Sequence, residues 1–301
     1  MSMSEVDHRS LLTGLTAEQR RELTGLSDGK GLAQLALHLL LIAALAVPVA
    51  LRIPYWPLLL VPLGIAIIFL FTALHESVHG TAFKSEWLSR TIAHGAGFVV
   101  FVPAIWFRYF HFAHHRHTHD EALDPELMSR KPETFWQYVK YLSGIPMWIS
   151  LAKSLLVNAL GRGREDFVPE RAKRQVVTEA RLTIALYVLC LAVSVTLGTD
   201  MLLFLWVVPA VLGQPFLRAY LLAEHARCPH VANMLENTRT TYTTRLMRFL
   251  AWNMPYHAEH HAYPIVPFHK LPAFHVIAHA HLKETERGYV RFNRKFVSEL
   301  N

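Results

Sequence analysis

Apolar residues along this 301-residue chain gather into four long blocks. Residues 32–51 are interrupted only by Gln34 and His38, and residues 58–74 and 182–198 carry no charge. Residues 201–223 are apolar with Gln214 and Arg218 near their end. A helix needs about 20 residues to cross the hydrocarbon core of a membrane, with a lower limit near 17. The pattern therefore predicts four transmembrane helices.

Short links join these blocks in pairs: "RIPYWP" between the first two and "TD" between the last two. We therefore expect an all-α integral membrane protein with two helical hairpins and a helical cap on one side of the membrane. A single domain is expected over residues 1–301, with a polar lead-in over 1–31 that shows no signal-peptide pattern. The cap would consist of residues 75–181 and 224–301.

The basic residues indicate which side of the membrane carries this cap. The chain is 52% hydrophobic and 18% charged, with a formal net charge of +7, and the two cap segments hold 14 and 10 Lys and Arg residues. Under the positive-inside rule, both segments and the N-terminus face the cytoplasm. We expect a multi-pass protein of a bacterial plasma membrane, in contact with membrane lipids. Nucleic-acid binding is disfavoured, since the basic residues are dispersed among 23 acidic ones.

Two segments of the cap are apolar but do not have the pattern of a membrane span. Residues 92–107 are short and interrupted by two Gly and one Pro, which favours a re-entrant or interfacial segment. Residues 134–160 contain Lys140 and Lys153 and fit a helix lying along the membrane surface. The two cysteines form no C-x-x-C pair, which excludes a built-in iron–sulfur centre.

The histidines are unusual in number and in spacing. Nineteen are present, and three groups have helical spacing of three and four residues. All fall on the predicted cytoplasmic side: His75 and His79; His111, His114 and His115; His257, His260 and His261; and His225 at the end of the last apolar block. Unpaired imidazoles beside a bilayer are costly, so such groups indicate a functional site. Neutral imidazole is a common ligand for iron, zinc, copper and nickel.

The stretch His75-Glu76-Ser77-Val78-His79 spells H-E-x-x-H, the pattern of a zinc metalloprotease helix. A zinc protease needs one more protein ligand and an open position for water. Seven further histidines are too many for one tetrahedral zinc, whereas nine imidazoles can hold two six-coordinate ions with open positions. We therefore interpret Glu76 as a residue that orients a metal ligand. A zinc intramembrane protease with Glu76 as its general base stays a remote alternative.

"HESVH", "HFAHH" and "HAEHH", in this order around two membrane hairpins, resemble the integral-membrane fatty acid desaturase and hydroxylase superfamily. "NMPYHAEHHAYPIVP" is similar to the third histidine box of its desaturase branch. The resemblance implies a non-haem enzyme with two iron ions that uses O2 to attack an unactivated C–H bond of a lipid acyl chain. Carried over box by box, it implies nine ligands: His75, His79, His111, His114, His115, His225, His257, His260 and His261. Asn253 matches an Asn that, in parts of the family, touches a metal through water.

The resemblance favours fatty acid desaturation. A lipid or carotenoid hydroxylase or ketolase is the alternative within the same chemistry, and a non-enzymatic metal-binding membrane protein is an alternative from another class. Each turnover needs two electrons from outside. The chain shows no cytochrome b5 signature, no nucleotide fingerprint and no cluster cysteines, so we expect a separate ferredoxin-like or cytochrome donor. An acidic donor would suit the basic cytoplasmic face.

The remaining histidines carry weaker expectations. His117 and His119 extend the second box, and their role is left open between supporting the metal site, facing the substrate and neither. His275 and His279 read as part of a solvated amphipathic helix. His38 and His94 read as interfacial or helix-packing residues. Residues 233–245 form a polar segment that either covers the metal site, meets a lipid head group or is a plain loop.

Overall fold

The computed structural model of the chain describes residues 7–128 and 130–301, so the first six residues of the predicted lead-in lie outside it. Within the described residues, four stretches are long and apolar enough to cross a membrane: Ala17–Ala50, Trp56–His79, Glu170–Thr196 and Leu203–His225. The four predicted apolar blocks thus correspond to four candidate membrane-spanning helices. A fifth candidate is a pair of helices bent by 99°.

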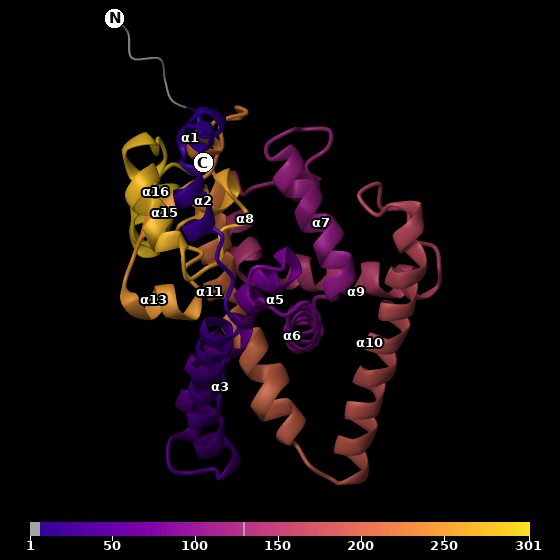
Figure 1. Cartoon of the computed structure of the whole chain (residues 1–301). Helices are drawn as coiled ribbons and strands as arrows, with labels where there is room; N and C mark the ends of the chain where they lie inside the picture. Colours follow the sequence, from indigo (N-terminus) through magenta and orange to yellow (C-terminus); the bar gives the residue numbers. More distant parts are fainter. Residues whose placement is uncertain (1–6, 129) are drawn as a thin grey trace, which may run out of the picture.

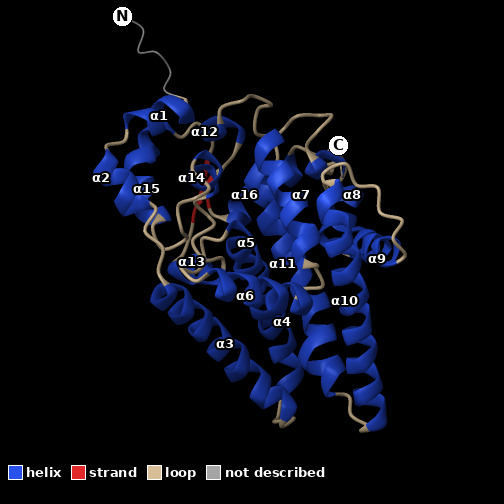
Figure 2. Cartoon of the chain, turned by 45° about the vertical axis from the view of Figure 1, so that its right-hand side comes forward, coloured by secondary structure: helices blue, strands red, loops and turns tan. Residues whose placement is uncertain are grey.

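These spans extend beyond the apolar blocks from which they were predicted. The first contains α3 (Asp28–Ala50), and the second is a 3-10 turn (Trp56–Leu59) followed by α4 (Leu60–Ile68) and α5 (Leu70–His79). The third is α10 (Glu170–Thr196), and the fourth is a π-helical turn (Leu203–Val207) followed by α11 (Val208–His225). Helix α10 begins at Glu170, 12 residues before the predicted start of the span at residue 182. The reason is that the helical backbone continues through the charged residues that flank the apolar block. In Figures 1 and 2 the spans form the lower part of the molecule.

Tight packing between α4 and α11 joins one member of each predicted hairpin. A Cβ added to Gly64 would lie 1.9 Å from the Pro209 carbonyl oxygen, and one added to Gly213 would lie 2.2 Å from the Gly64 oxygen. Small residues allow helix backbones to approach this closely within a membrane. Because α5 follows α4 directly, this contact carries the C-terminal ends of α5 and α11 to the same end of the bundle.

The bent pair consists of α6 (Glu86–Val99) and α7 (Ala104–His117). The bend lies within the segment expected to be re-entrant or interfacial. Its geometry is held by Glu179 of α10, whose carboxylate accepts hydrogen bonds from the backbone N–H groups of Ile105 (2.9 Å) and Trp106 (3.2 Å). A carboxylate at a helix N-terminus is stabilised by the helix dipole. From this anchor α7 runs away from the bundle and carries the second histidine box (Figure 1).

The other elements surround the ends of these helices. Before the first span lies α1 (His8–Gly14), and α2 (Ala17–Leu23) forms the beginning of that span ahead of α3. Between the second and third spans lie a 3-10 turn (Pro125–Met128), α8 (Phe135–Leu142) and α9 (Ile145–Ala159). The C-terminal part contains α12 (Met234–Asn237), β1 (Thr240–Tyr242), α13 (Arg245–Leu250), α14 (His257–Ala262), α15 (Leu271–Ala278), a 3-10 turn (His279–His281), β2 (Thr285–Arg287) and α16 (Tyr289–Ser298). Helix α2 starts with a capping box between Thr16 and Gln19.

The two strands correct the all-α prediction. β1 and β2 pair in parallel, with Thr240 opposite Thr285. Each strand has three residues, which is too short for an alternating apolar pattern to appear in the sequence. The fold is otherwise helical.

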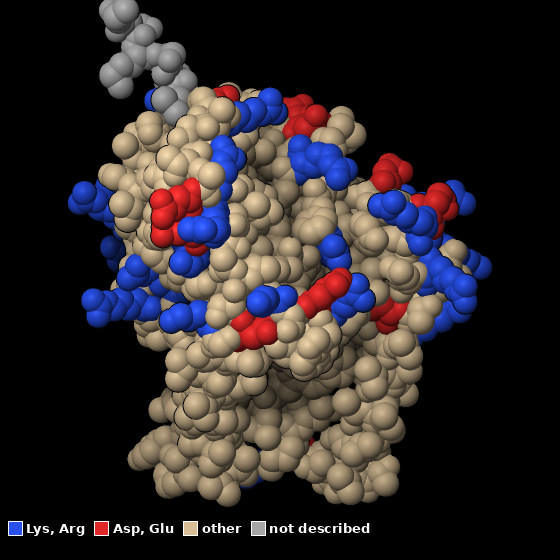
Figure 3. All heavy atoms as spheres, viewed as in Figure 1, with Lys and Arg blue, Asp and Glu red and all other residues tan. Residues whose placement is uncertain are grey.

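Charge divides the molecule into two parts. In Figure 3, Lys, Arg, Asp and Glu cover the upper part, while the lower ends of the long helices are almost free of charged side chains. Large apolar residues such as Leu186 and Leu189 on α10 are exposed there. Exposed apolar surface over a helix of this length fits contact with lipid.

Candidate metal centre

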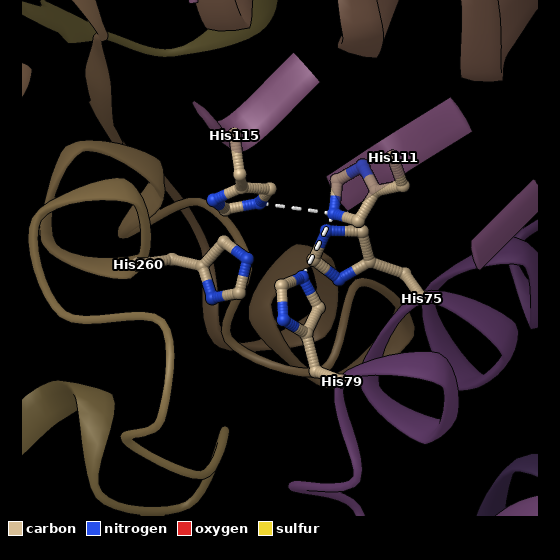
Figure 4. A group of neighbouring side chains, drawn as sticks. All are labelled: His75, His79, His111, His115 and His260. Atoms are coloured by element: carbon tan, nitrogen blue, oxygen red, sulfur yellow. Dashed lines mark hydrogen bonds between the residues drawn. The ribbon is translucent and has the colours of Figure 1, made fainter. Parts of the chain in front are cut away.

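The first set of converging side chains, which we call the first histidine group, contains five histidines. Their ring nitrogens lie within 4.8 Å of one another: His75 and His79 from α5, His111 and His115 from α7, and His260 from α14. Figure 4 shows the five rings pointing toward one another. His111 Nε2 lies 2.8 Å from His79 Nε2 and 3.0 Å from His115 Nε2.

The second histidine group lies beside the first and contains four histidines. His114, His225 and His261 have ring nitrogens within 4.8 Å of one another. His257 joins them, because its Nε2 lies 3.1 Å from His225 Nε2. His114 Nε2 also lies 3.1 Å from His225 Nε2. The two groups touch where the rings of His115 and His261 stack with centroids 4.0 Å apart.

Each histidine box is divided between the two groups by its helical spacing. On α7, His111 and His115 are four residues apart and enter the first group, while His114 turns to the second. On α14 the pair four residues apart, His257 and His261, enters the second group and His260 turns to the first. On a helix, two side chains four residues apart lie one turn above each other. A side chain three residues away from the first is rotated toward a neighbouring face of the helix. One helix can thus serve two adjacent sites.

Burial keeps the three imidazoles of α14 neutral. Desolvation holds the pKa of His257, His260 and His261 well below the ordinary value for histidine. Both ring nitrogens of His75 and of His260 are buried without a hydrogen-bond partner in the structure, as is Nε2 of His261. A buried polar atom without a partner is costly. Nine imidazoles that converge in two groups, several of them with such nitrogens, fit two metal ions as the missing partners.

Oxygen atoms orient several of these rings. Asp124 Oδ1 lies 3.0 Å from His114 Nδ1, which directs Nε2 of that ring to the second group. Glu224 Oε1 lies 3.5 Å from His257 Nδ1. Thr118 Oγ1 lies 3.3 Å from His261 Nδ1. A carboxylate or hydroxyl on the far nitrogen of a ligating histidine fixes the ring and its tautomer.

The sequence analysis did not identify these orienting residues. Glu224 directly precedes His225 in the sequence. This position does not reveal that its carboxylate lies next to a histidine of another helix. Asp124 lies ten residues after His114, in a turn whose path no periodic pattern predicts. Only the fold brings these carboxylates to the histidines.

Glu76 and Asn253 both contact the backbone of Phe268. Glu76 is fully buried, and its Oε2 accepts hydrogen bonds from Thr81 Oγ1 (2.6 Å) and from Phe268 N–H (3.4 Å). Asn253 has a left-handed backbone (φ 58°), and its Nδ2 donates to the Phe268 carbonyl oxygen at 3.1 Å. None of these hydrogen-bond partners is a histidine. The roles assigned to Glu76 and Asn253 toward the metals therefore stay predictions.

His275 corrects the expectation of a solvated helix face. Its side chain is only 18% exposed, and its Nδ1 is hydrogen-bonded to the fully buried Glu259 of α14. The sequence pattern shows which residues share a helix face, but not what packs against that face. His279 is exposed, as expected.

Three further histidines named as weaker candidates are His38, His94 and His119. His38 is buried, lies 2.8 Å from the Ala66 carbonyl oxygen through Nε2, and accepts a hydrogen bond from Trp252, which confirms a packing role. His94 Nδ1 lies 3.1 Å from Glu179. The ring of His119 lies between those of His225 and the partly exposed His230.

Comparisons with known proteins agree with this site. A family model described as fatty acid desaturase matches residues 50–293, a range that includes all nine histidines. Fatty acid conjugase FAC2 A of Calendula officinalis is 22% identical over 242 residues, which cover 70% of this chain and 64% of the relative. Fatty acid conjugase FAC2 B of the same plant is 23% identical over 242 residues with the same coverage. The alignment thus spans less than two thirds of the length of these curated relatives.

Proposed function

The chain belongs to the fatty acid desaturase family, and on this premise we propose that it is a membrane-bound, O2-dependent di-iron oxidoreductase that introduces double bonds into lipid acyl chains. The observation that carries the proposal is the convergence of nine buried or partly buried histidines in two adjacent groups, next to helices that lead into the apolar part. The two plant relatives are named fatty acid conjugases, which supports a fatty acyl substrate.

In this proposal the five imidazoles of the first group hold one iron ion and the four of the second hold the other. The bound ions would supply the redox chemistry that activates O2. The chain would contribute neutral ligands from α14, because burial disfavours the charged imidazolium of His257, His260 and His261. It also excludes water from the site, since His260 and Glu259 are fully buried.

Positioning of the substrate would come from the membrane helices. His75 and His79 lie at the C-terminal end of α5 and His225 at the C-terminal end of α11, so both helices lead from the apolar part of the protein directly to the site. An acyl chain lying along these helices would reach the metals from the lipid side. Removal of hydrogens from two neighbouring carbons requires that the chain be held in one position.

The surroundings of Glu76 argue against a zinc protease. His75 and His79 of the H-E-x-x-H stretch converge with three more histidines, which leaves no open position in a tetrahedral zinc site. Glu76 is hydrogen-bonded to Thr81 and to the Phe268 backbone, so its Oε2 is engaged away from these histidines. A general base would instead have to face a metal-bound water.

We further propose that both termini and the histidines lie on the cytoplasmic side. A separate ferredoxin-like or cytochrome protein would supply the two electrons of each turnover. The basic residues of this side, seen at the upper part of Figure 3, would favour an acidic donor.

Lipid mass spectrometry of cells that express the protein tests the reaction. Wild type should produce acyl chains lighter by about 2 mass units, the mass of the two hydrogens removed on desaturation, and a His260→Ala, His261→Ala double variant should not. A matched control replaces the histidines of the 3-10 turn after α15, His279→Ala and His281→Ala, and should retain activity. A gain of about 16 mass units would show hydroxylation instead. Unchanged lipids in cells with an intact, iron-loaded protein and a competent electron donor would contradict the proposal.

A further inference from the structure

A carboxylate lies at the edge of the second histidine group. Glu126 belongs to the 3-10 turn Pro125–Met128, and its Oε1 lies 3.9 Å from His114 Nε2. His114 Nδ1 is engaged by Asp124, so Nε2 is the nitrogen left for a metal ion. Glu126 therefore faces the metal side of this ring.

The distance between Glu126 and His114 suits two ligands of one ion. Protein oxygen and nitrogen ligands lie about 2.1 Å from a first-row metal ion, so two of them are about 3.0 Å apart at a right angle and about 4.2 Å apart on opposite sides. The 3.9 Å between Glu126 Oε1 and His114 Nε2 falls within this range. The 3.1 Å between His114 Nε2 and His225 Nε2 falls within it too.

Asp124 holds both partners in place. Its Oδ1 lies 3.0 Å from His114 Nδ1 and accepts a hydrogen bond of 2.9 Å from the backbone N–H of Glu126. The Glu126 side chain is one third exposed, and its Oε2 lies 3.8 Å from Lys131 Nζ. Among residues 7–128 and 130–301, no hydrogen bond to Glu126 Oε1 is formed. This oxygen is therefore available to a metal ion.

We infer, on the basis of the proposed di-iron function, that Glu126 is a ligand of the metal ion in the second histidine group. The first group has five imidazoles and the second has four. With Glu126 both ions have five protein donors, which leaves one position of six open at each. The second ion then differs from the first in having an anionic oxygen ligand, a type that iron accepts together with imidazole.

Iron release from the purified full chain tests this assignment. Wild-type protein in detergent, loaded with two irons per chain, is mixed with an excess of a ferrous chelator, and the release of each iron is followed by absorbance. Glu126→Gln should release one iron at least about tenfold faster and leave the other unchanged, as expected for loss of a ligand-site interaction. The Mössbauer signal of one of the two irons should change with it.

Two further variants separate ligation from a surface role. Lys131→Met removes the neighbouring cation but keeps the carboxylate, and should release iron at the wild-type rate. Glu126→Ala should release one iron quickly, and added acetate should slow that release by replacing the missing carboxylate. This second variant also serves if Glu126→Gln does not fold.

The outcomes distinguish this inference from the proposed function. Wild-type release rates and Mössbauer signals in Glu126→Gln, or the same fast release in Lys131→Met, would overturn the assignment of Glu126. A wild-type chain that cannot hold two irons would instead overturn the di-iron function itself.

Discussion

At the scale of single residues, oxygen atoms lie beside several histidines of the candidate metal site. Asp124 engages His114, and Glu224 lies beside His257. At His114 the Asp124 oxygen decides which ring nitrogen is free to bind a metal, because Nδ1 is engaged with it. The histidines thus depend on residues that are not ligands themselves.

Asp124→Asn should weaken the binding of one iron by about 10- to 100-fold, the usual cost of losing such an orienting group. The amide is neutral and cannot replace a carboxylate that engages His114 and also accepts from the backbone of His119 and Glu126. Iron titration of the purified protein measures the loss. Asp120→Asn is the matched control, since the Asp120 side chain is exposed and accepts hydrogen bonds from the backbone N–H groups of Ala122 and Leu123 rather than from a histidine. Equal iron affinity in the two variants would contradict the role of Asp124.

Cys228 should resist alkylation in the folded protein. It is buried just beyond α11, and desolvation raises the pKa of its thiol to about 12. The thiolate is the reactive form, so at pH 8 almost none is present, and its fraction rises about tenfold for each pH unit up to the pKa. Mass spectrometry after iodoacetamide treatment at several pH values measures this. Labelling of Cys228 at pH 8 as fast as in the unfolded chain would count against it.

At the scale of elements, the helices could be predicted but their partners could not. Apolar length predicted the four spans, and the spacing of the histidines predicted that each box lies on a helix; α5, α7 and α14 confirm this. The hydrophobic pattern does not show that α4 packs tightly on α11. Two helices approach this closely where small residues of one meet small residues of the other. The sequence of one helix does not show which other helix packs against it.

Gly64→Ala should destabilise the protein by about 1–3 kcal/mol, the usual cost of adding a methyl group to a filled interface. The added Cβ would fall on the backbone of Pro209, and neither helix can move without shifting the ends that carry histidines. Thermal unfolding in detergent measures the change. In the control Gly95→Ala, on α6, the methyl group meets open space, so stability should be equal or higher. A melting temperature of Gly64→Ala at or above that of wild type would refute the prediction.

At the scale of the whole molecule, charge and apolar surface determine how the protein lies in the membrane. Charged side chains cover one part and leave the far ends of the spans nearly bare (Figure 3). Turns at those bare ends, such as the one that carries Asp200, should face outward if the basic part is cytoplasmic.

Single-cysteine labelling tests this orientation in a background without Cys190 and Cys228. Asp200→Cys should react with a membrane-impermeant maleimide on intact cells, while Ser298→Cys in α16 should react only after the cells are opened. Loss of the exposed Arg52–Asp200 ion pair should matter little. Reaction in the opposite order would show that the protein is inverted in the membrane.

The amino-acid sequence by itself determined the four spans and the nine histidines, because hydrophobic length and spacing along a helix are local properties that neighbouring residues carry. Tertiary structure alone decided how these histidines divide into two groups and which oxygen atoms lie next to their rings. The reason is that His114, His225 and His257 come from three helices that are far apart in the chain. Asp124, Glu126 and Glu224 reach them only through the path of a turn and the crossing of helices.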